Sequence, residues 1–401
     1  MSDVPTPEEF RAQARAWLAG VARPRPADGG WGTGDDSVAV FENWTAEQER
    51  EHTERIRAWE RTRYRAGWGA LSWPARFGGR DLPAYYEQLY QAEEAAFDVP
   101  KRTEIFPVTQ QLVAPAVRLW GTPEQQDRWI APMLSTEVLA CQLFSETEAG
   151  SDLASVRTRA VRDGDHWVLD GHKVWTSGAR VADWGVAVCR TDPAVRKHAG
   201  ITVFLVPMDA PGVTVRPIRQ MTGGASFNEV YLDGVAVSDE NRLGPVGEGW
   251  RVTLSVLAAE RLDSGNNLGL ANADRAVALA GHLGRPLTGG EAERAADLFV
   301  RALVQRLIGL RVTAALVAGR EPGAEASVGK LYATETMRRT SDLVVRLLGP
   351  RVAADTGEWG TFAWTEHLLG APGYRIAGGT DEIQRNILAE RVLGLPREPS
   401  R

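Results

Sequence analysis

Cysteine is scarce in this chain: only Cys141 and Cys189 occur among its 401 residues. Two cysteines cannot build the disulfide framework that stabilises small secreted domains. Histidine is also scarce, and its six residues are scattered without the spacing of metal ligands. We therefore expect neither a disulfide-bonded scaffold nor a metal site.

Long apolar runs and blocks of basic charge are missing as well. No apolar run approaches the roughly 18 residues that a membrane-spanning helix needs, and the N-terminus lacks the pattern of a signal peptide. The net charge of −6 and the lack of a basic cluster argue against binding to nucleic acid or to an anionic membrane surface. These absences predict a soluble, cytoplasmic protein without nucleic-acid or membrane partners.

The order of the hydrophobic patterns predicts three domains. Helical spacing of apolar residues occurs in residues 7–22, 45–67, 83–97 and 109–134, and again in 250–281, 291–319, 324–348 and 380–393. Between them lie short β-rich runs, among which residues 166–175 predict a hairpin that turns at Asp170-Gly171. We expect an α+β multidomain chain: an N-terminal α-helical domain (1–137), a middle β-barrel or β-sandwich domain (138–245) and a C-terminal helical bundle (246–401).

Two polar motifs lie in the β region. Residues 141–152 read Cys-Gln-Leu-Phe-Ser-Glu-Thr-Glu-Ala-Gly-Ser-Asp, so a loop there can bring backbone N–H groups and a hydroxyl against a polar heterocycle or a phosphate. Residues 174–178, Val-Trp-Thr-Ser-Gly, offer an indole that can stack on a flat ring, next to hydroxyls that can bond a ring nitrogen. A core tryptophan beside solvated hydroxyls explains either motif alone equally well.

A glycine turn stands before the last predicted helix. Gly378 and Gly379 precede Thr380, which can cap that helix. Such a turn directs backbone N–H groups at one point, which suits an anion or a polarised carbonyl. The plain alternative is a structural loop.

Together with residues 67–79, 221–243, 260–261 and 376–396, these motifs resemble those of acyl-CoA dehydrogenases over nearly the whole chain. Cys-Gln-Leu-Phe-Ser-Glu (141–146) and Phe-Asn-Glu-Val (227–230) are similar to an often actinobacterial subgroup that includes enzymes of steroid side-chain breakdown, some of them heteromeric. The resemblance implies a C-terminal four-helix bundle, with FAD between it and the middle domain. It also implies α,β-dehydrogenation of an acyl-CoA or acyl-carrier thioester, with hydride passing to flavin N5.

The resemblance also assigns residues to the cofactor and the substrate. Gln142, Phe144 and Ser145 line the pyrimidine side of the flavin, Trp175 packs on the ring system and Ser177 bonds N5. Thr380 and Glu382 contact the dinucleotide half of FAD, and Arg285 reaches the FAD of a neighbouring subunit. Ser151 touches the cofactor or the thioester, and Arg261 is assigned to the substrate.

The base that removes the α-proton is predicted at Glu260. Many members of the family place a glutamate where this chain has Gly378, but a second family position, just before an arginine on the first long helix of the bundle, matches Glu260-Arg261. Val252 and Val256 precede Glu260 at helical spacing, so its carboxylate projects from an apolar stripe, which raises the pKa of a carboxyl group. The alternative is a glutamate paired with an arginine of a neighbouring helix. Gly378 is then expected to polarise the thioester carbonyl through its N–H and to leave room for a bulky acyl group.

Several positions depart from the family pattern. Thr147-Glu148 replace Pro-Gly, Ser238 replaces a proline, Thr288 stands where a phenylalanine is usual, and Gly-Pro-Arg-Val (349–352) replaces a glycine-rich segment. The altered dinucleotide-contact segments leave one alternative, a FAD-poor partner subunit of a heteromeric enzyme. The loop residues are equally compatible with another, an oxygen-using acyl-CoA oxidase or a tailoring enzyme. The expected partners are an acyl-CoA substrate, an electron-transfer flavoprotein as acceptor, and either copies of the same chain in a dimer or tetramer or a related subunit in a heterotetramer.

Overall fold

The computed structural model describes residues 4–25, 38–264, 271–320, 323–353 and 363–397. The chain forms two compact units. The first comprises Met1–Pro24, Trp44–Gln220 and Ala225–Glu260, and the second comprises Arg25–Asn43, Met221–Gly224 and Arg261–Arg401. Each unit is therefore assembled from segments that lie far apart in the sequence.

Three helices of the first unit begin at capping threonines. Thr6, Thr45 and Thr122 each form a capping box with the residue three positions on, which satisfies backbone N–H groups that a helix start leaves unpaired. The helices so started are α1 (Pro7–Val21), α2 (Ala46–Arg65) and α6 (Pro123–Leu134). With α3 (Tyr85–Glu94), they lie where residues 7–22, 45–67, 83–97 and the end of 109–134 were predicted helical.

Residues 109–134 were predicted helical and are helical except at Gly121 and Thr122. The segment divides into a π-helical turn (Val108–Val113, after the short α4, Ile105–Pro107), α5 (Ala114–Trp120) and α6. The break falls at Gly121, where an added Cβ would come within 2.5 Å of the Val117 carbonyl oxygen. The chain reverses there, and Pro123 starts the next helix.

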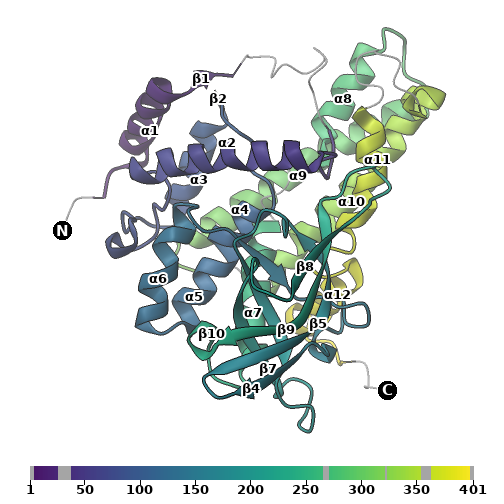
Figure 1. Cartoon of the computed structure of the whole chain (residues 1–401). Helices are drawn as coiled ribbons and strands as arrows, with labels where there is room; N and C mark the ends of the chain where they lie inside the picture. The colour runs from purple at the N-terminus through teal and green to yellow at the C-terminus, as the bar shows by residue number, and fades with distance from the viewer. Residues whose placement is uncertain (1–3, 26–37, 265–270, 321–322, 354–362, 398–401) are drawn as a thin grey trace. The chain divides into compact units, whose positions relative to one another are not determined.

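A sheet forms the β part of the first unit (Figure 1). It has eight strands, in the order β10-β7-β6-β4-β5-β9-β8, with β3 paired in parallel to β6. Its strands are β3 (Ala140–Leu143), β4 (Arg159–Asp163), β5 (His166–Ser177), β6 (Trp184–Arg190), β7 (Ile201–Pro207), β8 (Val213–Ile218), β9 (Phe227–Ser238) and β10 (Arg242–Leu243). A separate short pair joins β1 (Arg23–Pro24) to β2 (Phe97–Asp98).

The predicted hairpin at Asp170-Gly171 is not present. Strand β5 continues through both residues, and its register against β9 shifts between Leu169 and Gly171. A Cβ at Gly171 would come within 2.3 Å of Thr158 Oγ1, so glycine is needed there for close approach. The turn lies instead at Gly164, which has a φ of 61° and joins β4 to β5.

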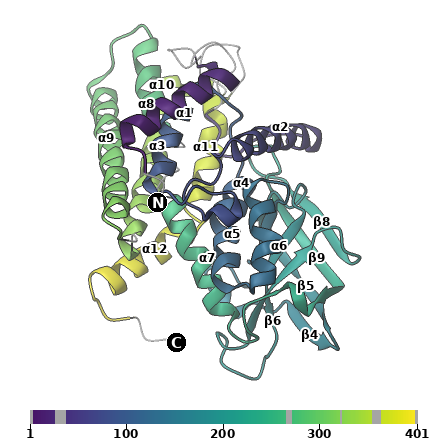
Figure 2. The same cartoon turned by 90° about the vertical axis from the view of Figure 1, so that its left-hand side faces the viewer.

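Residues on the central strands β6 and β7 alternate between two hydrophobic cores. Val186 and Val203 face one core, which also contains Val117 and Trp129 of the helices, whereas Phe204 and Cys189 face the other. Both faces of these strands are covered, so their sequences are almost continuously apolar. Figure 2 shows α5, α6 and α7 (Gly249–Ser264) side by side against this sheet.

The second unit is a helical bundle of α8 (Ala273–His282), α9 (Gly289–Val317), α10 (Ser327–Leu348), α11 (Ala363–Tyr374) and α12 (Asp381–Ile387), and a π-helical turn (Leu388–Val392) follows α12. Residues 250–281 were predicted as one helix, but α7 and α8 are separate, with residues 265–270 outside the described ones. The sequence patterns did not predict α11, which contains Gly370, Pro372 and Gly373.

A segment from the N-terminal part of the chain, Val38–Asn43, belongs to this bundle. Val38 joins its hydrophobic core, and Phe41 stacks on Tyr374 with ring centroids 5.2 Å apart. The two glycines of α11 allow this packing, because a Cβ on Gly373 would come within 2.8 Å of the Phe41 ring. Asn43 Nδ2 donates to Glu366 Oε1 at 2.7 Å.

Candidate functional site

The loop after strand β3 carries the first group of predicted site residues. Gln142 lies in β3 between the fully buried Cys141 and Leu143. Its side-chain Nε2 is buried and, within the described part of the chain, has no hydrogen-bond partner. An unpaired buried amide donor is costly, and a ligand with an acceptor group at this position would satisfy it. Phe144 is buried in the core, and Ser145 is half-buried.

Trp175, on β5, has an unusual backbone. Its φ is 62°, a left-handed value that is a genuine outlier for a bulky residue, and the register of β5 against β9 shifts between Lys173 and Thr176. The indole is 61% exposed and meets only the edge of Phe227 among the described aromatic rings. The bulge therefore presents a large flat surface outward.

The end of β5 holds two hydroxyls and a glycine. Thr176 is buried, and its Oγ1 has no hydrogen-bond partner among the described residues, whereas Ser177 is half-buried. Gly178 follows with a φ of 66°, and a Cβ there would come within 2.9 Å of Ile105. The strand can end in this way only with glycine at position 178.

The two motifs of the β part lie together. Val174 N–H donates to the Ser145 carbonyl oxygen at 2.9 Å, which joins the loop after β3 directly to the bulge of β5. Thr109 connects the same region to the helices, because its Oγ1 accepts from Ala140 N–H at 2.8 Å. The structure thus brings into contact the two motifs that carry Gln142, Phe144, Ser145, Trp175 and Ser177.

Ser151 lies on the exposed continuation of this loop. The next residue, Asp152, pairs with Lys197 at 2.7 Å and accepts from Ser155 Oγ. Hydrogen bonding from Lys197, and then from Ser155, lowers the pKa of Asp152. This ion pair ties the Ser151 loop to the loop between β6 and β7.

Sequence reasoning gave no role to the buried ion pair under this region. Lys173 of β5 is fully buried, and its Nζ lies 2.8 Å from Glu146 Oε1. One sequence signal could have predicted this pair: Lys173 occupies an inward-facing position of a strand. A charged residue is buried only when it is paired, so such a lysine implies an acidic partner. Its partner Glu146 belongs to the 141–152 motif.

The second unit holds the remaining predicted residues. Gly378 and Gly379 have φ values of 63° and 80°, and Thr380 caps α12 by accepting from Ile383 N–H. Gln384 Nε2 donates back to the Gly378 carbonyl oxygen at 2.8 Å. The predicted glycine turn before a capped helix is therefore present, although α12 itself ends at Ile387.

Asp381 anchors this turn to α10. Its carboxylate pairs with Lys330 at 2.9 Å and with Arg375 at 2.9 Å, and it also accepts from Thr334. Burial would raise the pKa of Asp381, but these three donors hold it below its ordinary value. Glu382 is exposed and pairs with Arg385.

Arg285 is engaged within its own chain. Its guanidinium makes two hydrogen bonds to Glu291, at 3.0 and 2.9 Å, and Glu291 also accepts from Thr288 N–H at the start of α9. Hydrogen bonding from Arg285 is the main cause that lowers the pKa of Glu291 to about 2. The predicted contact of Arg285 with a neighbouring FAD stays a prediction.

The predicted base lies on α7, the helix that begins at Gly249. Val252 and Val256 of this helix are buried, and Glu260 stands one helical turn beyond Val256. The side chains of Glu260 and Arg261 lie outside the described residues. The role of Glu260 therefore remains a prediction from the sequence.

Three family models match the chain. They are "Acyl-CoA dehydrogenase, N-terminal domain" over residues 36–137, "Acyl-CoA dehydrogenase, middle domain" over 141–235, and "Acyl-CoA dehydrogenase, C-terminal domain" over 247–393. The matched stretches follow one another in the predicted order of helical, β and helical domains. The exact boundaries predicted at residues 137 and 245 stay predictions.

Similar proteins and structures extend this match over the whole chain. The acyl-CoA dehydrogenase IpdE1 of Mycobacterium tuberculosis is 37% identical over 99% of this chain and 99% of its own length. A structure described as the Tcur3481-Tcur3483 steroid ACAD is 29% identical, with a TM-score of 0.78 and coverage of 99% of both chains. The ChsE4-ChsE5 complex from Mycobacterium tuberculosis is 26% identical, with a TM-score of 0.73 and coverage of 99% of this chain and 100% of the other.

Proposed function

Because the chain belongs to the acyl-CoA dehydrogenase family, whose members bind FAD, we propose that it oxidises an acyl thioester to the 2-enoyl thioester. The observation that carries this proposal is the exposed indole of Trp175, held on a strained backbone, in a motif that is hydrogen-bonded to the loop after β3, where Gln142 has an unpaired buried amide. A flat heterocycle with hydrogen-bond acceptors at its edge would cover the first and satisfy the second.

The described residues fit the isoalloxazine ring of FAD. Trp175 would pack on the ring, Gln142 and Ser145 would face its pyrimidine edge, and Ser177 would bond N5. Thr380, Glu382 and Arg285 stay assigned to the dinucleotide half. When bound, FAD supplies the acceptor for the hydride that leaves the β-carbon of the substrate.

Glu260 is proposed to take the α-proton. An α-C–H of a thioester is a weak acid, so its removal needs a nearby carboxylate together with a hydrogen bond to the carbonyl oxygen on which charge develops. The Gly378 N–H is proposed to donate that hydrogen bond. Arg261 is proposed to contact the substrate.

The substrate is proposed to be a bulky acyl-CoA. A glycine at position 378 adds no side chain where many relatives carry a glutamate, and a similar solved structure is described as a steroid enzyme. An anaerobic titration with acyl-CoA thioesters of increasing bulk tests this point. A strong preference for short, straight chains would contradict it.

The E260Q variant tests the base. We expect this variant to keep a normal bound-flavin spectrum while the rate of flavin reduction by substrate falls by roughly 10²–10⁴-fold, because proton transfer is lost. The measurement is anaerobic stopped-flow bleaching of the flavin absorbance. E248Q is the matched control, since Glu248 lies directly before α7 and is paired at the surface with Arg251 at 3.2 Å. An E260Q protein that reduces its flavin as fast as E248Q would refute the assignment.

We further propose that the acting molecule is a homo-oligomer. Helix α9 carries an exposed apolar stripe whose residues follow one another at spacings of three, four, three and seven: Val300, Leu303, Leu307, Leu310 and Val317. A single helix face that repeats in this way suits pairing with the same face of a second copy. A heterotetramer with a related subunit is the alternative, because a similar structure is described as the ChsE4-ChsE5 complex.

The proposed electron acceptor is an electron-transfer flavoprotein.

A further inference from the structure

Lys173 and Glu146 form an ion pair beneath the proposed flavin site. The lysine side chain has no exposed surface, and the carboxylate is largely buried. Each of the three Nζ protons has an acceptor: Glu146 Oε1 at 2.8 Å, the Val188 carbonyl oxygen at 2.7 Å and the Phe144 carbonyl oxygen at 3.1 Å. The ammonium group therefore joins β5 to β6 and to the loop after β3.

Glu146 is held just as completely. Its carboxylate accepts from the backbone N–H groups of Arg157 and Thr158, at 2.6 and 2.8 Å, in addition to Lys173. Burial would raise the pKa of Glu146, but Lys173 and these hydrogen bonds hold it below its ordinary value. The carboxylate is thus fixed as an anion between the loop and the segment that leads into β4.

Lys173 of the ion pair lies two residues before the strained residue, Trp175. The register of β5 shifts between Lys173 and Thr176, and Trp175 takes its left-handed conformation inside that shift. On the far side, Asn228 Nδ2 donates to the Thr176 carbonyl oxygen at 3.0 Å. A strained backbone persists only where its surroundings fix it on both sides, and these two anchors do so.

We propose that Lys173 and Glu146 are positioning residues for the flavin. Their ion pair holds the bulge that turns the Trp175 indole outward before any cofactor binds. The inference rests on the proposed function, because it presupposes that Trp175 packs on the isoalloxazine ring. The inference thus adds Lys173 and Glu146 to the residues that determine flavin binding, and both act through Trp175 rather than by touching the flavin.

The test measures FAD affinity of the purified full-length protein by titration of apoprotein, followed by flavin fluorescence. We expect K173M to raise the Kd for FAD tenfold or more, because the bulge loses one anchor and Glu146 is left as an unpaired buried charge. In a W175A background the same substitution should change the Kd less than threefold, because Trp175 no longer transmits the effect. The double variant K173M/E146Q removes both charges and remains informative if K173M alone folds poorly.

D239N is the matched control in the same unit. Asp239 is another anchor of the β part, which accepts from Trp167 Nε1 at 2.7 Å and pairs with Arg242 at 2.7 Å. D239N should lower the urea midpoint of unfolding and leave the Kd for FAD within twofold of the unchanged chain. A general loss of stability would therefore not imitate the expected result.

Two outcomes would overturn the inference. One is a Kd for FAD in K173M/E146Q equal to that of the unchanged chain. The other is an equal loss of affinity from K173M in the presence and absence of Trp175. If the unchanged chain itself binds no FAD, the proposed function fails instead, which separates the two failures.

Discussion

Trp175 combines a left-handed backbone, a position inside a strand and a mostly exposed indole. A bulky residue in such a conformation costs of order 1–3 kcal/mol, which the surrounding structure must offset. The anchors at Lys173 and Asn228 supply that support. Because exposing the Trp175 indole requires this strained backbone, the indole fits a role in binding a ligand rather than in stabilising the fold.

Replacing Trp175 with glycine separates the cost of its strained backbone from the role of its indole in binding. We expect W175G to be more stable than W175A by about 1 kcal/mol, because glycine adopts positive φ without the Cβ penalty while both variants lose the indole. Urea unfolding of the apoproteins measures the difference. Both variants should bind FAD more weakly than the unchanged chain, and a W175A protein as stable as W175G would show that the backbone there is not strained.

At the residue scale, the polar motifs identified Ser145 and Trp175 as candidates, and the family resemblance added Gln142. Neither signal gave a role to Lys173 or Glu146, because an inward-facing lysine in a strand pattern does not show which acidic residue lies against it. The side chain of Glu260 lies outside the described residues, so its proposed role rests on the family position before Arg261 and on helical spacing after Val252 and Val256.

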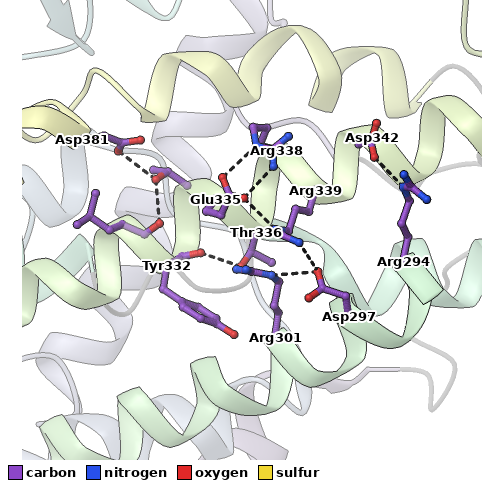
Figure 3. Close-up of polar contacts among 12 residues, drawn as sticks. Arg294, Asp297, Arg301, Tyr332, Glu335, Thr336, Arg338, Arg339, Asp342 and Asp381 are labelled. Atoms are coloured by element: carbon purple, nitrogen blue, oxygen red, sulfur yellow. Dashed lines mark hydrogen bonds and ion pairs between the residues drawn. The ribbon is translucent and has the colours of Figure 1, made fainter. Parts of the chain in front are cut away.

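Helices α9 and α10 are joined by a network of ion pairs (Figure 3). Asp297 of α9 accepts from Arg301 of the same helix and from Arg339 of α10, and Arg294 reaches across to Asp342. Within α10, Glu335 pairs with Arg338 and Arg339 at 2.8 Å each. These contacts fix the register between the two long helices.

The network predicts acid sensitivity. Hydrogen bonding from Arg338, and then from Arg339, lowers the pKa of Glu335 to about 2. The pKa is lower in the folded state than the ordinary value of about 4.3, so the stabilisation is complete above that value and is lost as the pH falls toward 2. We expect the stability difference between the unchanged chain and E335Q to be largest near pH 6 and to shrink below about pH 4.

Urea unfolding at a series of pH values measures this difference. E51Q, at an exposed position of α2, is the control. An E335Q difference that stays constant down to pH 3 would contradict the prediction.

Elements with strong local signals were predictable. The helical spacing of the sequence located α1, α2 and α9 closely. The hairpin at Asp170-Gly171 was predicted wrongly, because the same dipeptide serves a bulge when a neighbouring residue, here Thr158, needs the missing Cβ. Helix α11 was not predicted, because glycines weaken a helical sequence pattern. Its glycines are required for packing against Phe41, which lies far away in the sequence.

At the scale of the whole molecule, the order of helical, β and helical domains followed from the sequence, and the family match bears it out. The division into two units did not follow, since residues 25–43 and 221–224 join the C-terminal bundle. Short segments of this kind carry no periodic signal. Among the described residues, no helix combines the length and the apolar character needed to cross a lipid bilayer.

The apolar stripe on α9 predicts self-association. We expect the unchanged chain to have a solution mass that is a multiple of 43.7 kDa, and L303E/L307E to be a monomer, because two charges would be buried unpaired in the interface. Light scattering after size exclusion gives both masses. V161E is the control, since Val161 is a similarly exposed apolar residue on β4. A monomeric unchanged chain would refute the homo-oligomer and favour a heteromeric partner.

The segment Val38–Asn43 has a consequence for how the protein is made. Asn43 bonds Glu366 across 323 residues of chain, and Val38 accepts from Asn272 across 234. Contacts of such separation cost loop-closure entropy and slow folding. The bundle therefore cannot be completed during synthesis until α11 has left the ribosome. Val38–Asn43 is translated early, but it can reach its packed position only after α11, near the end of the chain, has been translated.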